Sequence, residues 1–564
     1  MKKLTALFLI LFITAQLCTA VYGEELPVGT KFSDMEYSRP NIEKLLNSAA
    51  AVMETVIANE ESAETVKALL ETFLDEYNSF YTMQTLSQIR YFQDTSDEFY
   101  YAEYSACSEM SGMVEMAAEN VYIACANSAH AQELEAEYFW DGFSDDYGED
   151  SVGRYSDAVV ELKAREKELI NRFYELSAAP VVNINGTDVE LYSYLASADD
   201  SVYSAALTEY YRQYNEKYAE IFIELVKLRH TLASKMGYKD VWDMQCDTFD
   251  RDFSKEQANA FLNDTAEKIV PVYTQMLASG KTVDGLYLDE ETLMEIMDAV
   301  MSDVGAYTDE AYRYMKEFGL FDVSGSENKA QVSFTSYLNR YEEPFSFVAC
   351  SSTEADIFSF SHEFGHFAQM YASFNALTSL DLSEVYSQAM EMLLVARADV
   401  VLEEEYAELL RIYKLSDILS TYIQQGMLAR FEEIVYSVDP ELLSTEMLNF
   451  ICLACAEQFG LTGYGDEEYC ALLWCDVAHL YEFPFYVISY PVSVDAAMQL
   501  YAAELESTGL GAEIFDAMLP FENMQLVEAL EKAGFSSPFE SGRLDAAANI
   551  LREVLINGTA KNAA

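Results

Sequence analysis

The sequence predicts an all-α fold, and three observations support this prediction. Apolar residues recur at three- and four-residue steps along most of the 564 residues, which is the periodicity of amphipathic helices. Few stretches alternate apolar and polar residues at period two, as half-buried strands do. Prolines, which break helices, number only ten. Because the chain is too long for one simple core, we expect two subdomains or one large helical body.

The first predicted element is a secretory signal peptide at residues 1–23. The sequence "MKKLTALFLILFITAQLCTAVYG" has two lysines, an apolar run from Leu4 to Leu17, and small residues before Glu24. This order is typical of a cleaved signal, so we expect the mature protein to be secreted or extracytoplasmic. An uncleaved anchor is the alternative, but the run is short for a bilayer. No later stretch predicts a membrane span, so no stable membrane association is expected after cleavage.

Two long helical blocks follow, and we predict a domain boundary between them. Residues 157–179 and 200–238 repeat apolar residues at helical spacing, with charged residues in between. The stretch "INGTDVELYSYLASADD" separates the two blocks and has the composition of a connection. The prediction is therefore an N-terminal helical lobe at residues 24–195 and a larger domain at residues 196–564.

The balance of charges excludes two classes of partner. The chain carries 34 basic and 96 acidic residues, which gives a formal net charge of −62. So negative a surface repels nucleic acid and anionic lipid. We therefore expect neither of them as a partner.

The cysteines do not predict a disulfide scaffold or a metal cluster. Cys18 belongs to the predicted signal peptide, which leaves eight of the nine. Cys452 and Cys455 lie in an apolar helical stretch, and the spacing of Cys470 and Cys475 is too loose for the usual zinc knuckle. We expect buried free thiols or one disulfide.

One short β element is expected near residues 332–350. The stretch "VSFTSYLNRYEEPFSFVAC" is rich in β-branched and aromatic residues and is interrupted by Pro344. This composition predicts a short hairpin or an edge pair. The element lies just before a pair of histidines, where an extended peptide could add as another strand.

The stretch "FSFSHEFGHFAQMY" has the strongest chemical signal in the chain. Thr353 and Asp356 have the spacing of a capping box, which predicts the start of a helix. On that helix His362 and His366 project from one face, one turn apart. Two imidazoles at this spacing suit Zn²⁺, and Glu363 beside them could take a proton from a water activated by the metal. The alternative is a helix whose histidines are only capped or salt-bridged.

A third ligand is expected from the following helical stretch, "DLSEVYSQAMEMLL". Glu384, Gln388 and Glu391 share one face of this stretch. A solvated face would give the same pattern, but a polar face so soon after a histidine pair favours the wall of a site. We predict that Glu384 is the third ligand and that Glu391 orients a histidine.

A further candidate segment, "HLYEFPFYVISYPVSVDAAMQLY", covers residues 479–501 and combines a histidine with a row of tyrosines. Amide hydrolysis develops a negatively charged oxygen, and tyrosine and histidine are suitable donors to it. An aromatic-rich core helix would explain the tyrosines equally well. It explains His479 less easily.

Taken together, these motifs resemble the thimet oligopeptidase and oligoendopeptidase F family of zinc metallopeptidases, most closely its bacterial oligoendopeptidase branch. The resemblance rests on "HEFGHF", "SEVYSQAME", "FPFYVISYPVSVDAAMQL" and the upstream "LASKMGYKDVWDM", which follow one another in the right order within residues 200–555. It implies a two-lobed helical clamshell with a deep channel, which admits short unstructured peptides and excludes folded proteins.

The resemblance also implies roles for particular residues. One Zn²⁺ would be held by His362, His366 and Glu384, with Glu363 as the base. The strand at "PFSFVAC" would correspond to the edge that pairs with the peptide backbone in such enzymes.

In the C-terminal segment, the resemblance implies that His479, Tyr486 and Tyr490 bind substrate and stabilise the transition state. One departure is Gln369, which stands where many relatives carry a further histidine. That residue is not a zinc ligand in the family, so the metal site is expected to be intact.

The expected function is zinc-dependent hydrolysis of internal bonds of short peptides by the domain at residues 196–564. The alternatives are a carboxypeptidase or dipeptidyl carboxypeptidase on the same scaffold, and a catalytically silent peptide-binding protein. The sequence leaves peptide length, side-chain preference and oligomeric state open.

Overall fold

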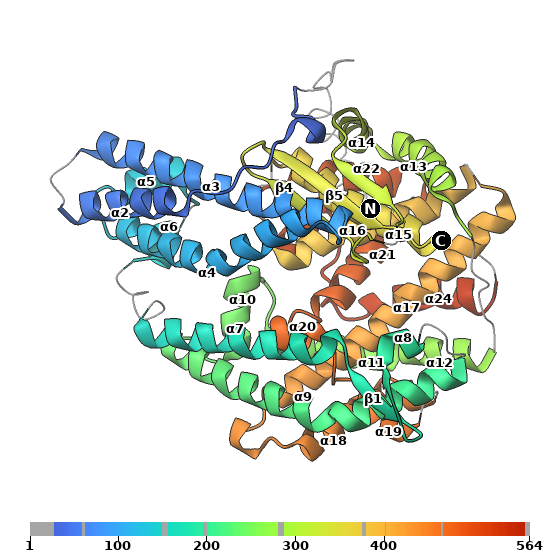
Figure 1. Cartoon of the computed structure of the whole chain (residues 1–564). Coiled ribbons are helices and arrows are strands. Elements are labelled where there is room, and N and C mark those ends of the chain that lie inside the picture. Colours follow the sequence, from blue (N-terminus) through green and yellow to red (C-terminus); the bar gives the residue numbers. More distant parts are fainter. Residues whose placement is uncertain are drawn as a thin grey trace. The chain divides into compact units, whose positions relative to one another are not determined.

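The computed structural model describes residues 28–558, apart from short segments at 59–61, 141, 149–155, 196–199, 280–286, 327, 375–378, 401 and 464–465. The predicted signal peptide lies outside the described residues. The chain divides into two compact units (Figure 1), which are Met1–Ser156 with Gly285–Ala376 (unit 1) and Asp157–Asp284 with Leu377–Ala564 (unit 2). The boundary predicted between residues 195 and 196 falls within unit 2 and stays a prediction.

Helices make up most of both units, which confirms the all-α fold class. Those of unit 1 are α2 (Ile42–Ala58), α3 (Ala63–Gln93), α4 (Glu98–Ala126), α5 (Ala131–Tyr138), α6 (Phe143–Asp146), α13 (Glu290–Val304), α14 (Ala306–Phe318) and α15 (Ala355–Ala372), with a 3₁₀ turn η1 (Phe32–Asp34).

The helices of unit 2 include both long blocks that the sequence predicts, α7 and α9. They are α7 (Asp157–Ala178), α8 (Leu191–Leu195), α9 (Asp200–Met236), α10 (Val241–Phe249), α11 (Lys255–Lys268), α12 (Val270–Ser279), α16 (Leu380–Arg397), α17 (Glu404–Val435), α18 (Thr445–Gln458), α19 (Glu467–Ala471), α20 (Ala478–Glu482), α21 (Ser489–Glu506), α22 (Leu510–Met518), α23 (Leu526–Ala533) and α24 (Arg543–Leu555). Three 3₁₀ turns join them, η3 (Ala398–Val400), η4 (Pro440–Leu442) and η5 (Leu461–Gly463).

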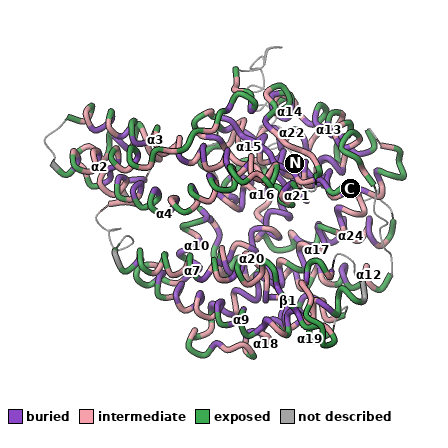
Figure 2. Tube along the Cα trace, viewed as in Figure 1, coloured by how far each residue is buried: buried purple, intermediate pink, exposed green. Residues whose placement is uncertain are grey.

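The N-terminal part of unit 1 is a cluster of α2, α3 and α4, which pack against one another. Ser62 and Asp97 cap the starts of α3 and α4 by accepting hydrogen bonds from backbone N–H groups one turn into each helix. Their apolar faces share one core, in which Leu70, Phe73 and Val114 are buried. Figure 2 shows buried and exposed residues alternating along these helices, as expected of amphipathic helices around a core.

A three-stranded sheet in unit 1 supports the helix that bears the histidine pair. Its strand order is β3 (Phe321–Ser324), β5 (Glu343–Ala349), β4 (Phe334–Leu338), with β4 antiparallel and β3 parallel to β5. The hairpin predicted near residues 332–350 is therefore confirmed. The expectation that "PFSFVAC" forms an edge is wrong, because β5 is paired on both sides and is almost completely buried. The edges of this sheet are β3 and β4.

Unit 2 contains a small hairpin that the sequence reasoning missed. β1 (Val181–Ile184) pairs with β2 (Thr187–Glu190), and the turn between them is Asn185-Gly186. Both turn residues have positive φ, 54° and 88°, which is the conformation that this dipeptide favours in two-residue hairpins. The Asn-Gly pair was the signal that could have identified it.

The core of unit 2 is built around α16, α17 and α21, which pack against one another. Most residues of α16 and α21 are buried on all sides, so these two helices form the interior of the unit. Within the described residues all eight cysteines are free thiols, in agreement with the first of the two predicted states. None of the described helices is long and apolar enough to cross a membrane.

Candidate active site

Helix α15, which carries the histidine pair, starts where the sequence predicts, although by a different capping arrangement. The carboxylate of Asp356 accepts hydrogen bonds from the backbone N–H groups of Ser351, Ser352 and Thr353, at 2.7 to 3.3 Å. The Thr353 hydroxyl instead lies 2.9 Å from the Ser351 hydroxyl, so only the acidic half of the predicted capping box forms.

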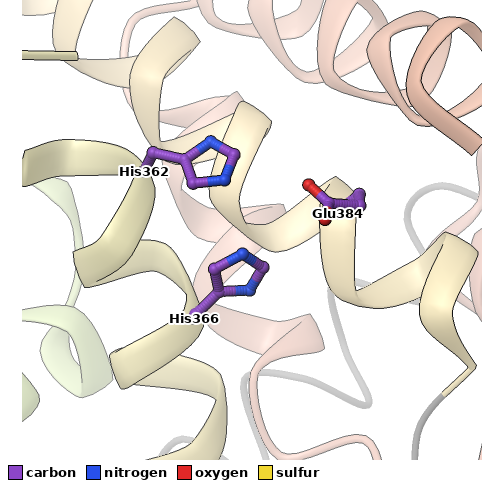
Figure 3. A group of neighbouring side chains, drawn as sticks. All are labelled: His362, His366 and Glu384. Atoms are coloured by element: carbon purple, nitrogen blue, oxygen red, sulfur yellow. The ribbon is translucent and has the colours of Figure 1, made fainter. Parts of the chain in front are cut away.

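The three predicted metal ligands come together. His362 and His366 lie one turn apart on α15, and Glu384 lies on α16; one ligand atom from each, all three within 4.8 Å of one another, could hold an ion. Figure 3 shows the two imidazole rings and the carboxylate turned toward a common point. Two nitrogen donors and one carboxylate oxygen form the donor set of a catalytic zinc site, which leaves a position for water or substrate.

The protonation state of His366 suits a metal. Burial, and secondarily the neighbouring His362, lower the pKa of His366 to about 3. His366 is therefore neutral at physiological pH, which is the form that coordinates a metal ion. The residues present thus fit the zinc that the sequence implies, and their role as ligands stays a prediction.

Glu363, the predicted base, is held from the neighbouring sheet. Its side chain is buried, and the Thr335 hydroxyl on β4 lies 2.8 Å from Glu363 Oε2 and 2.9 Å from its backbone oxygen. The Ser346 hydroxyl on β5 lies 3.0 Å from Thr335 Oγ1 and 3.3 Å from the Glu363 backbone oxygen. Ser346 can therefore donate to the backbone oxygen while Thr335 donates to the carboxylate.

Within unit 2, His479, Tyr486 and Tyr490 form a hydrogen-bonded row that ends at Glu384. Tyr486 donates to Glu384 Oε1 at 3.0 Å, Tyr490 donates to the Tyr486 hydroxyl at 3.2 Å, and Tyr490 Oη lies 3.4 Å from His479 Nε2. If the ring carries its proton on Nε2, every contact in this row has one donor and one acceptor. The structure thus brings together the three residues that the sequence predicts from the C-terminal segment.

Burial sets the protonation of this row. Burial, with the negative charge of Glu384 next in size, raises the pKa of Tyr490 to about 12 and that of Tyr486 further. Burial also lowers the pKa of His479. At neutral pH both tyrosines are therefore hydrogen-bond donors and His479 is uncharged.

The rest of the polar face of α16 is occupied by structural contacts. Gln388 Oε1 accepts a hydrogen bond from the Ser493 hydroxyl at 2.9 Å. Glu391 forms a buried ion pair with Lys414, which also contacts Asp417 at 2.7 Å. The predicted role of Glu391 in orienting a histidine stays a prediction.

Sequence reasoning missed Thr335 as a partner of Glu363. Thr335 lies 28 positions before Glu363, and a threonine in a strand gives no chemical signal of its own. Its place in the predicted hairpin, directly before the histidine helix, was the available clue.

Comparison with sequence families gives two matches along the chain. The model described as "Peptidase M3 N-terminal domain" matches residues 32–144, and the model described as "Peptidase family M3" matches residues 294–519. Together they match more than half of the chain, and the second contains all seven predicted site residues. No curated protein matches the sequence significantly.

Comparison with solved structures finds the same fold along nearly the whole chain. PZ peptidase A, solved with an inhibitor, has a TM-score of 0.77 at 24% identity, with 93% of this chain and 99% of that chain covered. A protein assigned as oligoendopeptidase F from Bacillus anthracis gives 0.74 at 23%, with coverages of 94% and 100%. Oligoendopeptidase-F from Enterococcus faecium gives 0.60 at 16%, with coverages of 92% and 98%. At these identities the likeness concerns the fold.

Proposed function

The chain belongs to peptidase family M3, and on this premise we propose that it is a zinc-dependent oligoendopeptidase, which hydrolyses internal bonds of short unstructured peptides. One observation carries the proposal: His362, His366 and Glu384 offer a zinc-type donor set, with the carboxylate of Glu363 on the same helix as the histidines. Zn²⁺ held there would supply Lewis acidity, which polarises a peptide carbonyl and makes water a nucleophile near neutral pH.

Glu363 is proposed as the general base and, later, the general acid. Its carboxylate takes a proton from the attacking water and then delivers a proton to the departing amine nitrogen. The hydrogen bond from Thr335 to Oε2 fixes the orientation of the carboxylate and so holds it in one position for proton transfer.

Tyr486, Tyr490 and His479 are proposed as the donors that stabilise the developing oxyanion. Both tyrosines keep their protons at neutral pH because burial raises their pKa values. A neutral hydroxyl still carries its proton when negative charge develops on the carbonyl oxygen, and Tyr486 would then turn from Glu384 Oε1 to donate to that oxygen.

Two other activities are possible for the same residues. A carboxypeptidase or dipeptidyl carboxypeptidase would need a cation to bind the terminal carboxylate of its substrate. A silent peptide-binding protein would keep the fold without turnover. Glu363 is buried and accepts a hydrogen bond from Thr335. This favours an enzyme over a binder, because a protein that only binds peptides does not need a general base held in this way.

Product analysis with capped peptides tests the proposal. A mixed-sequence peptide of about ten residues, acetylated and amidated at its ends, offers no free terminus to an exopeptidase. We expect zinc-loaded protein to cleave it internally, as seen by mass spectrometry, and a chelator followed by zinc to abolish and then restore the cleavage. Removal of one or two C-terminal residues from uncapped peptides, with the capped peptide left intact, would identify the carboxypeptidase mode. No cleavage of either set would favour a binder.

We also propose that the protein acts outside the cytoplasm, on short peptides that reach it there. The support is the N-terminal sequence, with its two lysines, apolar run and small residues before Glu24. N-terminal sequencing of the protein from the culture medium or cell envelope should give a chain that begins near Glu24. An intact N-terminus on membrane-bound protein would contradict this.

A further inference from the structure

Phe485, the residue before Tyr486, has an unusual backbone conformation. Its φ is +62°, in the left-handed region that large side chains rarely adopt, and its ring is buried. A conformation of this kind persists only where the surrounding structure enforces it. Phe485 lies in the turn that the Tyr486 N–H closes by bonding to the Phe483 carbonyl at 3.1 Å, so its conformation helps to set the direction of the Tyr486 side chain.

Two buried polar side chains hold both backbone groups of Phe485. The Phe485 N–H donates to Glu432 Oε1 at 2.9 Å, and the Phe485 carbonyl accepts a hydrogen bond from Arg251 Nη1 at 3.1 Å. The side chains of Arg251 and Glu432 are both fully or almost fully buried.

Arg251 also forms hydrogen bonds with two other residues. Its Nε and Nη2 donate to the two carboxylate oxygens of Asp381, at 2.9 and 3.0 Å, and Nη2 also donates to the Ser489 hydroxyl at 2.9 Å. Asp381 lies in the first turn of α16, three residues before Glu384. Ser489 is the first residue of α21. One guanidinium therefore connects the start of the helix that bears Glu384 with the segment that bears Tyr486.

The guanidinium itself is held in place on all sides. The rings of Trp242, Phe249 and Phe253 lie 4.9 to 5.3 Å from its central carbon, within the range of cation–π attraction. The backbone of Arg251 is also fixed: α10 ends at Phe249, the next residue Asp250 is left-handed, and the Arg251 N–H bonds to the Cys246 carbonyl.

The helices α16 and α21 run in the same direction, joined by polar contacts along their length. Midway along the pair, the Ser493 hydroxyl donates to Gln388. At the C-terminal ends of the two helices, Arg397 and Glu504 form an ion pair at 3.1 Å. Arg251 and Arg397 are thus buried arginines at opposite ends of one helix pair, about 24 Å apart along α16. Only the Arg251 end contains Glu384 and Tyr486.

We propose that Arg251 is a positioning residue, which holds Phe485 in its left-handed conformation and thereby aims the Tyr486 hydroxyl at the site marked by Glu384. Lysine cannot replace it, because a single ammonium lacks the planar fork that binds Asp381 through two hydrogen bonds and still reaches Phe485 and Ser489. This inference deepens the proposed function and rests on it for its kinetic test.

A double-mutant cycle tests the inference. We expect Arg251→Lys to lower kcat for the capped peptide about 10- to 100-fold with little change in KM, because misplacing a catalytic group by about 1 Å has that effect. In a Tyr486→Phe background, Arg251→Lys should lower kcat less than about twofold, because the hydroxyl that it positions is gone. Equal losses in both backgrounds would overturn the inference.

Arg397→Lys is the matched control. It exchanges a similarly buried arginine on the same helix pair, so it should lower the melting temperature comparably while changing kcat less than about twofold. An equal loss of kcat from Arg397→Lys would mean that any damage to the helix pair suffices, and the inference would fall. If Arg251→Lys does not fold, Ser489→Ala can take its place, because it removes one partner of the guanidinium. We expect Ser489→Ala to lower kcat less than Arg251→Lys would, and this loss must vanish in the Tyr486→Phe background.

A second readout needs neither metal nor activity. Hydrogen exchange of metal-free protein, followed in a peptide that covers Phe485, should be faster in Arg251→Lys than in wild type and unchanged in Arg397→Lys. Unchanged exchange in Arg251→Lys would overturn the inference. A wild type that cleaves no peptide would overturn the proposed function, and this exchange measurement would still decide the role of Arg251.

Discussion

At the scale of single residues, the contact between Thr335 and Glu363 has a direct consequence for activity. Thr335→Val keeps the β-branched shape but removes the hydroxyl that holds the Glu363 carboxylate at 2.8 Å. We expect kcat to fall roughly tenfold with zinc content unchanged, because a loosely held base is less often correctly placed.

Two variants serve as controls for the Thr335 prediction. Thr335→Ser keeps the hydroxyl and should stay close to wild type. Thr265→Val replaces a fully buried threonine that donates only to a carbonyl of its own helix, and it should leave kcat unchanged. Equal losses in the valine and serine variants at position 335 would show that the hydroxyl is not what matters.

Glu432 makes a second residue-scale prediction, about stability and pH. Burial raises its pKa from 4.5 to about 8, against the lowering effect of the Phe485 N–H, Arg229 and Arg251. Between these values the folded protein binds a proton that the unfolded chain does not, so this group makes the protein less stable as pH rises from about 4.5 to about 8. Its stabilising contribution is complete below 4.5 and lost above about 8.

Glu432→Gln should remove this contribution, because the amide does not titrate and still offers an oxygen to the Phe485 N–H. Denaturant unfolding at pH 6 and pH 9 measures it. We expect the wild type to lose more free energy of unfolding than Glu432→Gln between these two pH values. Parallel losses would contradict the pKa assigned to Glu432.

The sequence predicts some of the candidate site residues and not others for a physical reason. His362 and His366 follow from helical spacing, since residues four apart share a face, and Glu363 follows from its place directly beside them in the chain. Arg251 contacts Asp381 at a separation of 130 residues, so only tertiary packing brings the two together.

At the scale of elements, the close approach of α21 and α22 depends on a glycine. A Cβ atom at Gly511 would lie 2.4 Å from the Leu500 carbonyl oxygen and 3.0 Å from Glu504 Cβ. Because the nearest atom is backbone, the helices must move apart to accommodate a side chain. We expect Gly511→Ala to lower the free energy of unfolding by about 1–3 kcal/mol in denaturant titrations.

Gly463→Ala is the control for this prediction, because a Cβ atom there meets nothing within 4 Å. It should change the free energy of unfolding by less than about 0.5 kcal/mol. A Gly511→Ala variant as stable as Gly463→Ala would mean that α21 and α22 are not so tightly packed.

Elements that local composition specifies could be predicted from the sequence. Features that depend on which strands pair with one another could not. Composition and Pro344 predicted the β4–β5 hairpin, but only the position of β3 makes β5 a central strand. The parallel pairing of β3 with β5 brings together segments separated by the whole of β4, and no local pattern specifies this.

At the scale of the whole molecule, the division into units could not be predicted from composition. Each unit takes two stretches of the chain, so its boundary depends on contacts between distant segments. The helical fold class, by contrast, follows from periodicity repeated along the chain.

The net charge of −62 makes a prediction about substrates. Cationic peptides should be attracted to so negative a protein, so their kcat/KM should exceed that of neutral peptides at low salt. The advantage should shrink as ionic strength rises, because the Debye length falls to about 8 Å at 0.15 M. Hydrolysis of matched cationic and neutral peptides over a salt series measures this, and identical salt profiles would contradict it.

The measurement that tests the central claim most directly compares wild type with Glu363→Gln, both loaded with zinc and assayed for metal content. The substrate is a quenched peptide of about ten residues. We expect one zinc per chain in both proteins, with internal cleavage by the wild type and a loss of at least about 100-fold in the variant, since the amide cannot accept the proton. Equal cleavage by both would contradict the role of Glu363. Zinc in both proteins with no cleavage by either would show that the chain is not an oligoendopeptidase.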